Sequence, residues 1–249
     1  MNVKKKIILI TGSSKGIGQG ISKIFLRDKS FFVILNSRKK NKYISQVEKK
    51  FLNVKYISGD ICSLNTIKKI INYLNIKKFS LNALVTNVGS GKSPKNGREK
   101  IRDYMSSLRV NFFSSLTPIY NLKKKFGYNC KIVCISSIAS KSIVNSPITY
   151  SVSKAALNSF IVNFAKNYKF NKICITGILP GHTMHDTSVW KKNILKKPKL
   201  TNELISAHIP TGEWIKPEDI SSLTYFLVNH DTNAFNGSLI DLEGGITTK

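Results

Sequence analysis

Short apolar runs alternate with longer segments of helical spacing along most of this chain. Seven runs have the length and β-branched composition of buried strands, and they cover residues 6–10, 31–35, 54–58, 81–86, 131–136, 172–179 and 238–242. Apolar residues recur with helical spacing in 19–27, 63–75, 102–125, 150–168 and a segment that begins at Pro217. This alternation, without a linker or repeat, predicts an α/β fold in a single domain over residues 1–249.

Two segments depart from the simple alternation. The helical pattern of 102–125 is interrupted near Pro118, because a proline inside a helix removes a backbone hydrogen bond. Residues 183–208 are basic and irregular. A loop of that length predicts a lid over the substrate.

The chain carries a formal charge of +27, from 40 Lys and Arg against 13 Asp and Glu. Such a surface attracts phosphates, acidic proteins, nucleic acid or anionic lipid. The lysines are spread along the chain with abundant Asn and Ile, a composition that an AT-rich genome produces. Because no RNA- or DNA-binding motif is visible, a compositional origin of the charge is favoured over a dedicated polyanion site.

Cysteine usage and hydropathy predict a soluble, cytoplasmic protein. The cysteines, at positions 62, 130, 134 and 174, form no Cys-x-x-Cys pair and have no histidine at metal-ligand spacing, so no metal site is predicted. Reduced cysteines in apolar runs fit a cytosolic compartment. The apolar run 7–10 is too short for a signal peptide, and no run approaches the roughly 20 residues of a membrane span.

A glycine-rich turn joins the first predicted strand to the first predicted helix. It reads Thr11-Gly12-Ser13-Ser14-Lys15-Gly16-Ile17-Gly18. Such glycines let backbone N–H groups approach a pyrophosphate, and the helix N-terminus adds positive potential. A lone glycine loop is a weak signal, but a strand before it and a helix after it support a dinucleotide site.

The residues after the second predicted strand distinguish two dinucleotides. An acidic side chain there binds the ribose 2′-hydroxyl of NAD, whereas Arg favours the 2′-phosphate of NADP. The chain has Asn36-Ser37-Arg38-Lys39-Lys40 at this place, with no acid. Arg38 and Lys15 therefore predict NADP(H) over NAD(H), and the competing interpretation is that Arg38 is merely solvated.

Tyr150 and Lys154 are four residues apart, so on a helix they share one face. A fixed cation favours the phenolate and lowers the pKa of a tyrosine from about 10, which makes Tyr150 a candidate general acid or base. Ser137 follows the strand 131–136 and lies at the sheet edge where ligands of open α/β sheets bind. Taken alone, the Tyr/Lys spacing also fits an ordinary helix pair, and the glycine turn favours the functional interpretation.

The stretch Ser90-Gly91-Lys92-Ser93 is similar to the end of a phosphate-binding P-loop. That motif needs a glycine five residues before its Gly-Lys pair, and the chain has Thr86 there. A P-loop is therefore not predicted.

Taken together, the motifs closely resemble those of the short-chain dehydrogenase/reductase family over essentially the whole chain. They are Thr11-Gly12-x-x-x-Gly16-Ile17-Gly18, Asn87-x-Gly89, Asn111, Ser137, Tyr150-x-x-x-Lys154 and Pro180-Gly181. The resemblance implies a Rossmann-type, doubly wound parallel sheet flanked by helices, a nicotinamide cofactor, and a homotetramer or homodimer.

The resemblance also implies a catalytic tetrad of Asn111, Ser137, Tyr150 and Lys154. In the family pattern the Ser hydroxyl polarises the substrate carbonyl and the Tyr gives it a proton. The Lys holds the nicotinamide ribose and lowers the Tyr pKa, and the Asn backbone supports a water relay to the Lys. The implied cofactor contacts include Asp60 and Ile61 at the adenine, Asn87 and Gly89 along the cofactor, the catalytic Tyr150 and Lys154, and the segment Pro180, Gly181 and Thr183.

Two departures leave the substrate open. The family often has two Asn and an Ala before the glycine, where this chain has Thr86-Asn87-Val88-Gly89. Its common Thr five residues after the Pro is His185 here. His182 and His185 are therefore candidates for substrate contact or for simple solvation.

The leading functional prediction is an NADP(H)-dependent reductase that acts on a 3-oxoacyl thioester carried by acyl carrier protein. The positive charge of this chain would suit an acidic carrier protein. Residues 90–100 and 190–198 instead resemble members that act on sugars or sugar-derived intermediates in surface polysaccharide pathways. A third possibility, of another class, is a catalytically idle protein that binds the cofactor and a polyanion. The complete Asn, Ser, Tyr and Lys set argues against it.

Overall fold

The computed structural model describes residues 5–168, 170–186, 188, 191, 195 and 209–247. In these residues, seven strands form one parallel sheet in the order β3-β2-β1-β4-β5-β6-β7. The strands are β1 Lys6–Thr11, β2 Phe31–Ser37, β3 Val54–Ser58, β4 Leu81–Thr86, β5 Phe126–Ile135, β6 Cys174–Pro180 and β7 Leu239–Leu242. The predicted Rossmann-like parallel sheet is confirmed.

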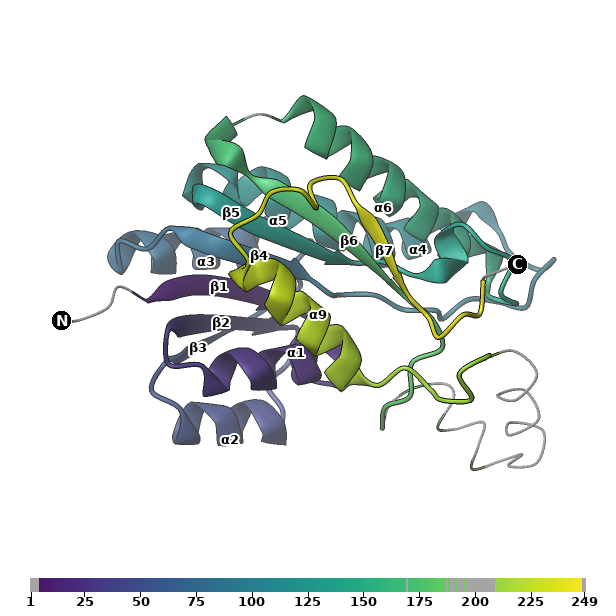
Figure 1. The fold of residues 1–249 in the computed structure, drawn as a ribbon, viewed down its shortest axis with the longest axis horizontal. Coiled ribbons are helices and arrows are strands. Elements are labelled where there is room, and N and C mark those ends of the chain that lie inside the picture. Colours follow the sequence, from purple (N-terminus) through teal and green to yellow (C-terminus); the bar gives the residue numbers. More distant parts are fainter. Residues whose placement is uncertain are drawn as a thin grey trace.

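Helices cover both faces of the sheet (Figure 1). They are α1 Gly16–Arg27, α2 Lys42–Lys50, α3 Leu64–Ile76, α4 Ile101–Leu108, α5 Ser114–Leu122, α6 Ile148–Asn167 and α9 Pro217–Asn229. Helices α1, α2 and α9 share one hydrophobic core with the sheet, and α3, α5 and α6 share the other. The two faces of the sheet are therefore both buried.

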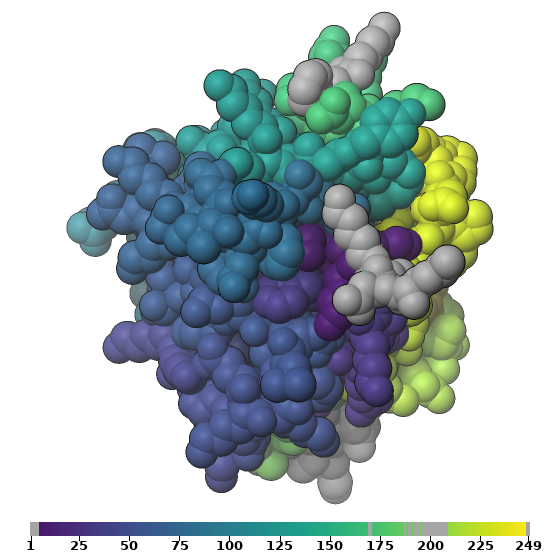
Figure 2. Space-filling model, turned by 90° about the vertical axis from the view of Figure 1, so that its left-hand side faces the viewer, coloured from purple at the N-terminus to yellow at the C-terminus, as the bar shows by residue number. Residues whose placement is uncertain are grey.

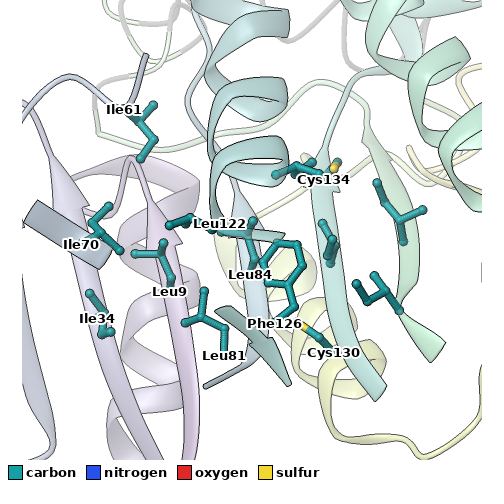
Figure 3. Close-up of a cluster of buried hydrophobic side chains, with 14 of the residues drawn as sticks. Leu9, Ile34, Ile61, Ile70, Leu81, Leu84, Leu122, Phe126, Cys130 and Cys134 are labelled. Atoms are coloured by element: carbon teal, nitrogen blue, oxygen red, sulfur yellow. The ribbon is translucent and has the colours of Figure 1, made fainter. Parts of the chain in front are cut away.

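The strands supply side chains to both cores in alternation. In β1, Ile8 and Ile10 belong to the core under α1, whereas Ile7 and Leu9 belong to the opposite core. Figure 3 shows Leu9 in this second core with side chains from neighbouring strands. Since both sides of a central parallel strand are buried, its sequence is continuously apolar, which is why the strands were recognisable from the sequence.

Helix α9, late in the sequence, packs against the first helix, α1. In Figure 2 the purple N-terminal residues lie beside the yellow-green C-terminal ones. The Tyr225 hydroxyl donates to Asp28 Oδ2 at 2.7 Å. This packing joins the chain's last helix to its first βα unit.

Several details differ from the sequence prediction, among them the start of β5, which lies at Phe126 and not at residue 131. The helix α2 was not predicted, although Asn41 caps it by accepting a hydrogen bond from Ile44 N at 3.0 Å. The predicted break at Pro118 was wrong, because α5 continues through that residue. The helical chain instead changes to a π-turn at Arg109–Phe113, one turn earlier.

The predicted lid at 183–208 lies largely outside the described residues, as does most of 190–198. Its described beginning is held to the rest of the domain: Met184 N donates to Ile215 O at 2.8 Å, and Ile215 N donates to His182 O at 3.2 Å. In the part of the chain that the structure describes, every helix is too short or too polar to span a bilayer.

Candidate cofactor pocket and active site

The strand order reverses between β1 and β4, which lie side by side although the chain visits β2 and β3 between them. In open α/β sheets, ligands bind at the carboxyl ends of strands beside such a reversal. A cavity of about 900 Å³ lies there. Its lining includes the predicted cofactor residues Gly12, Ser14, Lys15, Gly16, Ile17, Ser37, Arg38, Asp60, Ile61, Asn87 and Gly89.

The glycine turn at the base of the cavity is shaped for close approach. Gly12 and Gly16 have left-handed φ values of +64° and +54°. Gly18 lies under the turn, where a Cβ would come within 2.3 Å of Gly12 O. No side chain caps the N-terminus of α1, so its first N–H groups are available to an anion. These features fit the pyrophosphate of a dinucleotide.

Asn87 ties the glycine turn to β4. Its Nδ2 donates to Gly12 O at 3.2 Å, and its backbone N–H donates to the Thr11 hydroxyl at 3.1 Å. The side-chain nitrogen of Asn87, Nδ2, would lie 2.4 Å from a Cβ at Gly18. The predicted cofactor residue Asn87 therefore also holds the turn in shape.

The rim of the cavity beyond β2 is cationic. Arg38, Lys39 and Lys40 line it, and Asn41 Nδ2 donates to Ser14 O at 2.8 Å, which joins this rim to the glycine turn. The carboxylate in the lining, Asp60, forms an ion pair with Arg109 at 2.7 Å. Burial raises the Asp60 pKa, but hydrogen bonds from Cys62 N and Arg109 outweigh it and lower the pKa overall. The rim thus suits an additional phosphate.

His185 lies against the glycine turn. A Cβ at Gly16 would come within 2.9 Å of its imidazole ring, and the residue lines the cavity. Burial lowers the His185 pKa; Asp186 opposes this shift and Lys15 adds to it. The sequence left the roles of His182 and His185 open, and the structure places His185 against the glycine turn, in the cavity lining.

Asn111 lies in the π-turn and is fully buried. Its Oδ1 accepts from Ser90 N at 2.7 Å, while its Nδ2 donates to Ser90 O and to Ser107 Oγ, both at 3.0 Å. The π-turn also leaves the Val110 carbonyl to accept from Ser114 Oγ at 2.6 Å. The Asn111 side chain therefore pins the loop after β4 to the helix that follows.

Lys154 is 3% exposed and donates from Nζ to Ile135 O at 2.7 Å. A Cβ at Gly89 would lie 3.6 Å from the same Nζ and 3.2 Å from Asn111 Oδ1. Lys154 and Asn111 thus flank Gly89, a residue of the cavity lining. Burial lowers the pKa of Lys154 to about 8.

The structure brings the side chains of Ser137 and Tyr150 together. The prediction that the Lys154 cation lowers the Tyr150 pKa was wrong for the protein without cofactor. Burial raises the Tyr150 pKa, and a hydrogen bond with the Ser137 side chain opposes part of that rise. The Lys154 ammonium donates a hydrogen bond to the Ile135 carbonyl and does not lower the Tyr150 pKa. The Ser137 hydroxyl in turn accepts from Ala139 N at 3.2 Å.

The remaining predicted residues lie at the end of β6. Pro180 ends that strand, Gly181 N donates to Leu242 O at 2.9 Å, and Thr183 forms a β-bridge with Ile215. Neither these three nor Ser137, Tyr150 and Lys154 line the cavity. Within the described residues, no three His, Cys, Asp or Glu side chains gather to hold a metal ion.

Comparison with known proteins agrees with this geometry. Residues 6–197 match the family model described as short chain dehydrogenase. Hydroxynaphthalene reductase-like protein Arp2 of Metarhizium brunneum is 28% identical, with 98% of this chain and 95% of the relative covered. The 3-oxoacyl-[acyl-carrier-protein] reductase FabG of Buchnera aphidicola is also 28% identical, with 99% of each covered.

Solved structures share the fold. The L-sorbose reductase of Gluconobacter frateurii, complexed with NADPH and L-sorbose, superposes with a TM-score of 0.88 at 19% identity, covering 99% of this chain and 98% of that one.

Proposed function

Since this chain belongs to the short-chain dehydrogenase family, we propose that it is an NADP(H)-dependent oxidoreductase that interconverts a carbonyl and a secondary alcohol. The observation that carries the proposal is that Lys154 lies beside Gly89, a residue of the cavity lining, on the helix that also bears Tyr150, whose phenol interacts with the Ser137 side chain. When bound, the nicotinamide supplies or accepts the hydride.

The cavity residues bind and orient the cofactor. The turn from Gly12 to Gly18 receives the pyrophosphate on backbone N–H groups. Arg38, with Ser37 and Lys15 near it in the lining, holds the 2′-phosphate, as expected for NADP(H) rather than NAD(H). Asp60 and Ile61 lie at the adenine end.

The tetrad residues manage the proton. Tyr150 donates it to the carbonyl oxygen during reduction, and its raised pKa keeps the phenol protonated at neutral pH. Ser137 shares a hydrogen bond with that phenol and polarises the same carbonyl. Lys154 holds the nicotinamide ribose, and the Asn111 backbone supports a water relay to Lys154; the two side chains approach Gly89 at the same position.

Replacing Arg38 with Asp should reverse the cofactor preference. A charge-assisted hydrogen bond to the 2′-phosphate is worth about 1.5–3 kcal/mol, so NADPH affinity should fall by roughly 10- to 100-fold, while NADH affinity is kept or improved. Titration of both cofactors measures this. Lys69→Asp, an equal charge reversal at an exposed position on α3, is the matched control, and an unchanged preference in Arg38→Asp would refute the assignment.

The substrate we propose first is a 3-oxoacyl thioester, in line with the FabG relatives and with a cationic protein meeting an acidic carrier. The alternative is a keto-sugar or a related intermediate. NADPH oxidation with an acetoacetyl thioester, a diketone and keto-sugars separates the two, and the expected result is the highest kcat/KM on the thioester. Tight NADPH binding without any turnover would instead favour a binding role, which salt-dependent binding of a polyanion would support.

We further propose a homodimer or homotetramer. Large apolar side chains are exposed on α4, α5 and α6, namely Ile101, Met105, Tyr120, Ile148, Val152 and Val162. Helices α4 and α6 pack against each other. A grouped apolar surface of this kind is typical of subunit contacts.

A further inference from the structure

A hydrogen-bonded network outside the predicted tetrad surrounds Ser137. It is formed by Asn158, Ser136 and Ser140, and we call it the clasp. Asn158 lies on α6, one turn after Lys154, and is 8% exposed. Its Oδ1 accepts from Ser136 Oγ at 2.6 Å, and its Nδ2 donates to Ser140 Oγ at 2.6 Å. The side chain thus holds the residue just before Ser137 and the end of the short helix that follows it.

The clasp continues to Ser137 itself. The Ser140 hydroxyl accepts from Asn158 and donates its own hydrogen to Ser137 O. Ser137 Oγ accepts from Ala139 N at 3.2 Å, which leaves its hydrogen for the Tyr150 phenol. Both the backbone and the hydroxyl of Ser137 are therefore oriented.

Asparagine is well suited to this position because it offers an acceptor and a donor at once. With an aliphatic side chain, the buried Ser136 hydroxyl would lose its acceptor, and the half-buried Ser140 hydroxyl would lose its donor. With Asp, the acceptor for Ser136 remains, but a second acceptor would face Ser140 and draw its hydrogen away from Ser137 O. The side chain also belongs to the helix that carries Tyr150 and Lys154, so the clasp sets Ser137 relative to both.

We infer that Asn158 is a positioning residue that fixes the Ser137 hydroxyl on the Tyr150 phenol. The inference rests on the proposed function for its kinetic consequence. Its structural consequence, the Ser137–Tyr150 hydrogen bond, can be measured whether or not a substrate is known.

The test compares Asn158→Leu and Asn158→Asp with Asn163→Ala. Asn163 is exposed on the same helix, and among the described residues its side chain bonds only to Ser159. NMR of protein labelled at tyrosine Cζ reports the phenol hydrogen bond, and Tyr150→Phe assigns the Tyr150 signal. Both Asn158 variants should move that signal in the direction that Ser137→Ala moves it, whereas Asn163→Ala should leave it in place.

In turnover assays, the Asn158 variants should lose about 10- to 100-fold in kcat, the cost of a misplaced catalytic group, with NADPH affinity unchanged. An unmoved Tyr150 signal in folded Asn158→Asp would overturn the inference, as would a lower melting temperature with full kcat. If Asn158→Leu does not fold, the near-isosteric Asp variant and Ser140→Ala still decide it. Absence of turnover in the wild type would count against the proposed function only, because the NMR result stands alone.

Discussion

Tyr150→Phe is expected to remove most turnover while leaving NADPH binding intact. The substitution deletes the phenol oxygen and keeps the ring, so the packing of this partly buried side chain is preserved. Proton transfer by a positioned acid contributes about 10²- to 10⁴-fold to rate, and kcat should fall by that factor. Because the residues of the cavity lining are unchanged by the substitution, the NADPH affinity should stay close to the wild-type value while kcat falls.

The matched control is Tyr120→Phe, on the exposed side of α5, which should keep full activity. Cofactor fluorescence measures binding and NADPH oxidation measures turnover on the same preparations. If Tyr150→Phe lost NADPH affinity and melted early, the tyrosine would be a structural residue. If it kept full kcat, another group would be the acid.

The parts of the fold that depend on local sequence were predictable. Continuous apolar runs marked the strands because both faces of the sheet are covered. The glycine turn was recognisable because its residues are consecutive and only glycine tolerates the approach seen at Gly18.

The unpredicted parts depend on partners distant in sequence. The π-turn at Arg109–Phe113 forms where Asn111 bonds to Ser90, which lies 21 residues earlier. His185, which follows β6, packs on Gly16 although β4 and β5 separate β6 from β1 in the sheet. The role of Asn158 depends on Ser136 and Ser140, 22 and 18 residues away. None of these pairings follows from residue spacing.

The direction of the Lys154 ammonium could not be predicted for the same reason. Spacing places Lys154 and Tyr150 on one helix face, but the carbonyl that receives the ammonium belongs to Ile135, at the end of β5. Helix geometry alone therefore predicts a pair between the Tyr150 phenol and the Lys154 ammonium. In the folded chain the ammonium bonds to the Ile135 carbonyl instead.

Lys154→Met is expected to abolish turnover and, at neutral pH without cofactor, to stabilise the protein. Burial lowers the Lys154 pKa from 10.5 to about 8, which corresponds to a folding cost of about 3 kcal/mol for the charged form. Met fills a similar volume without charge. Loss of the charge-assisted bond to Ile135 O costs about 1.5–3 kcal/mol, so a net gain of at most roughly 1.5 kcal/mol should remain.

The pH dependence identifies the cause of that gain. Below pH 8 the lysine is protonated in both the folded and unfolded states, and the burial cost is fully present. As pH rises from about 8 to 10.5, the folded state releases the proton first, so the wild type becomes more stable relative to Lys154→Met. Denaturant unfolding of both proteins across this window measures the difference between their free energies of unfolding, and titrations common to both proteins cancel in that difference.

Lys166→Met, at an exposed position on α6, is the control and should have the stability of the wild type at every pH. A Lys154→Met variant less stable than the wild type at pH 7 would show that the ammonium's hydrogen bond outweighs its desolvation, and that this lysine holds the fold as well as the cofactor.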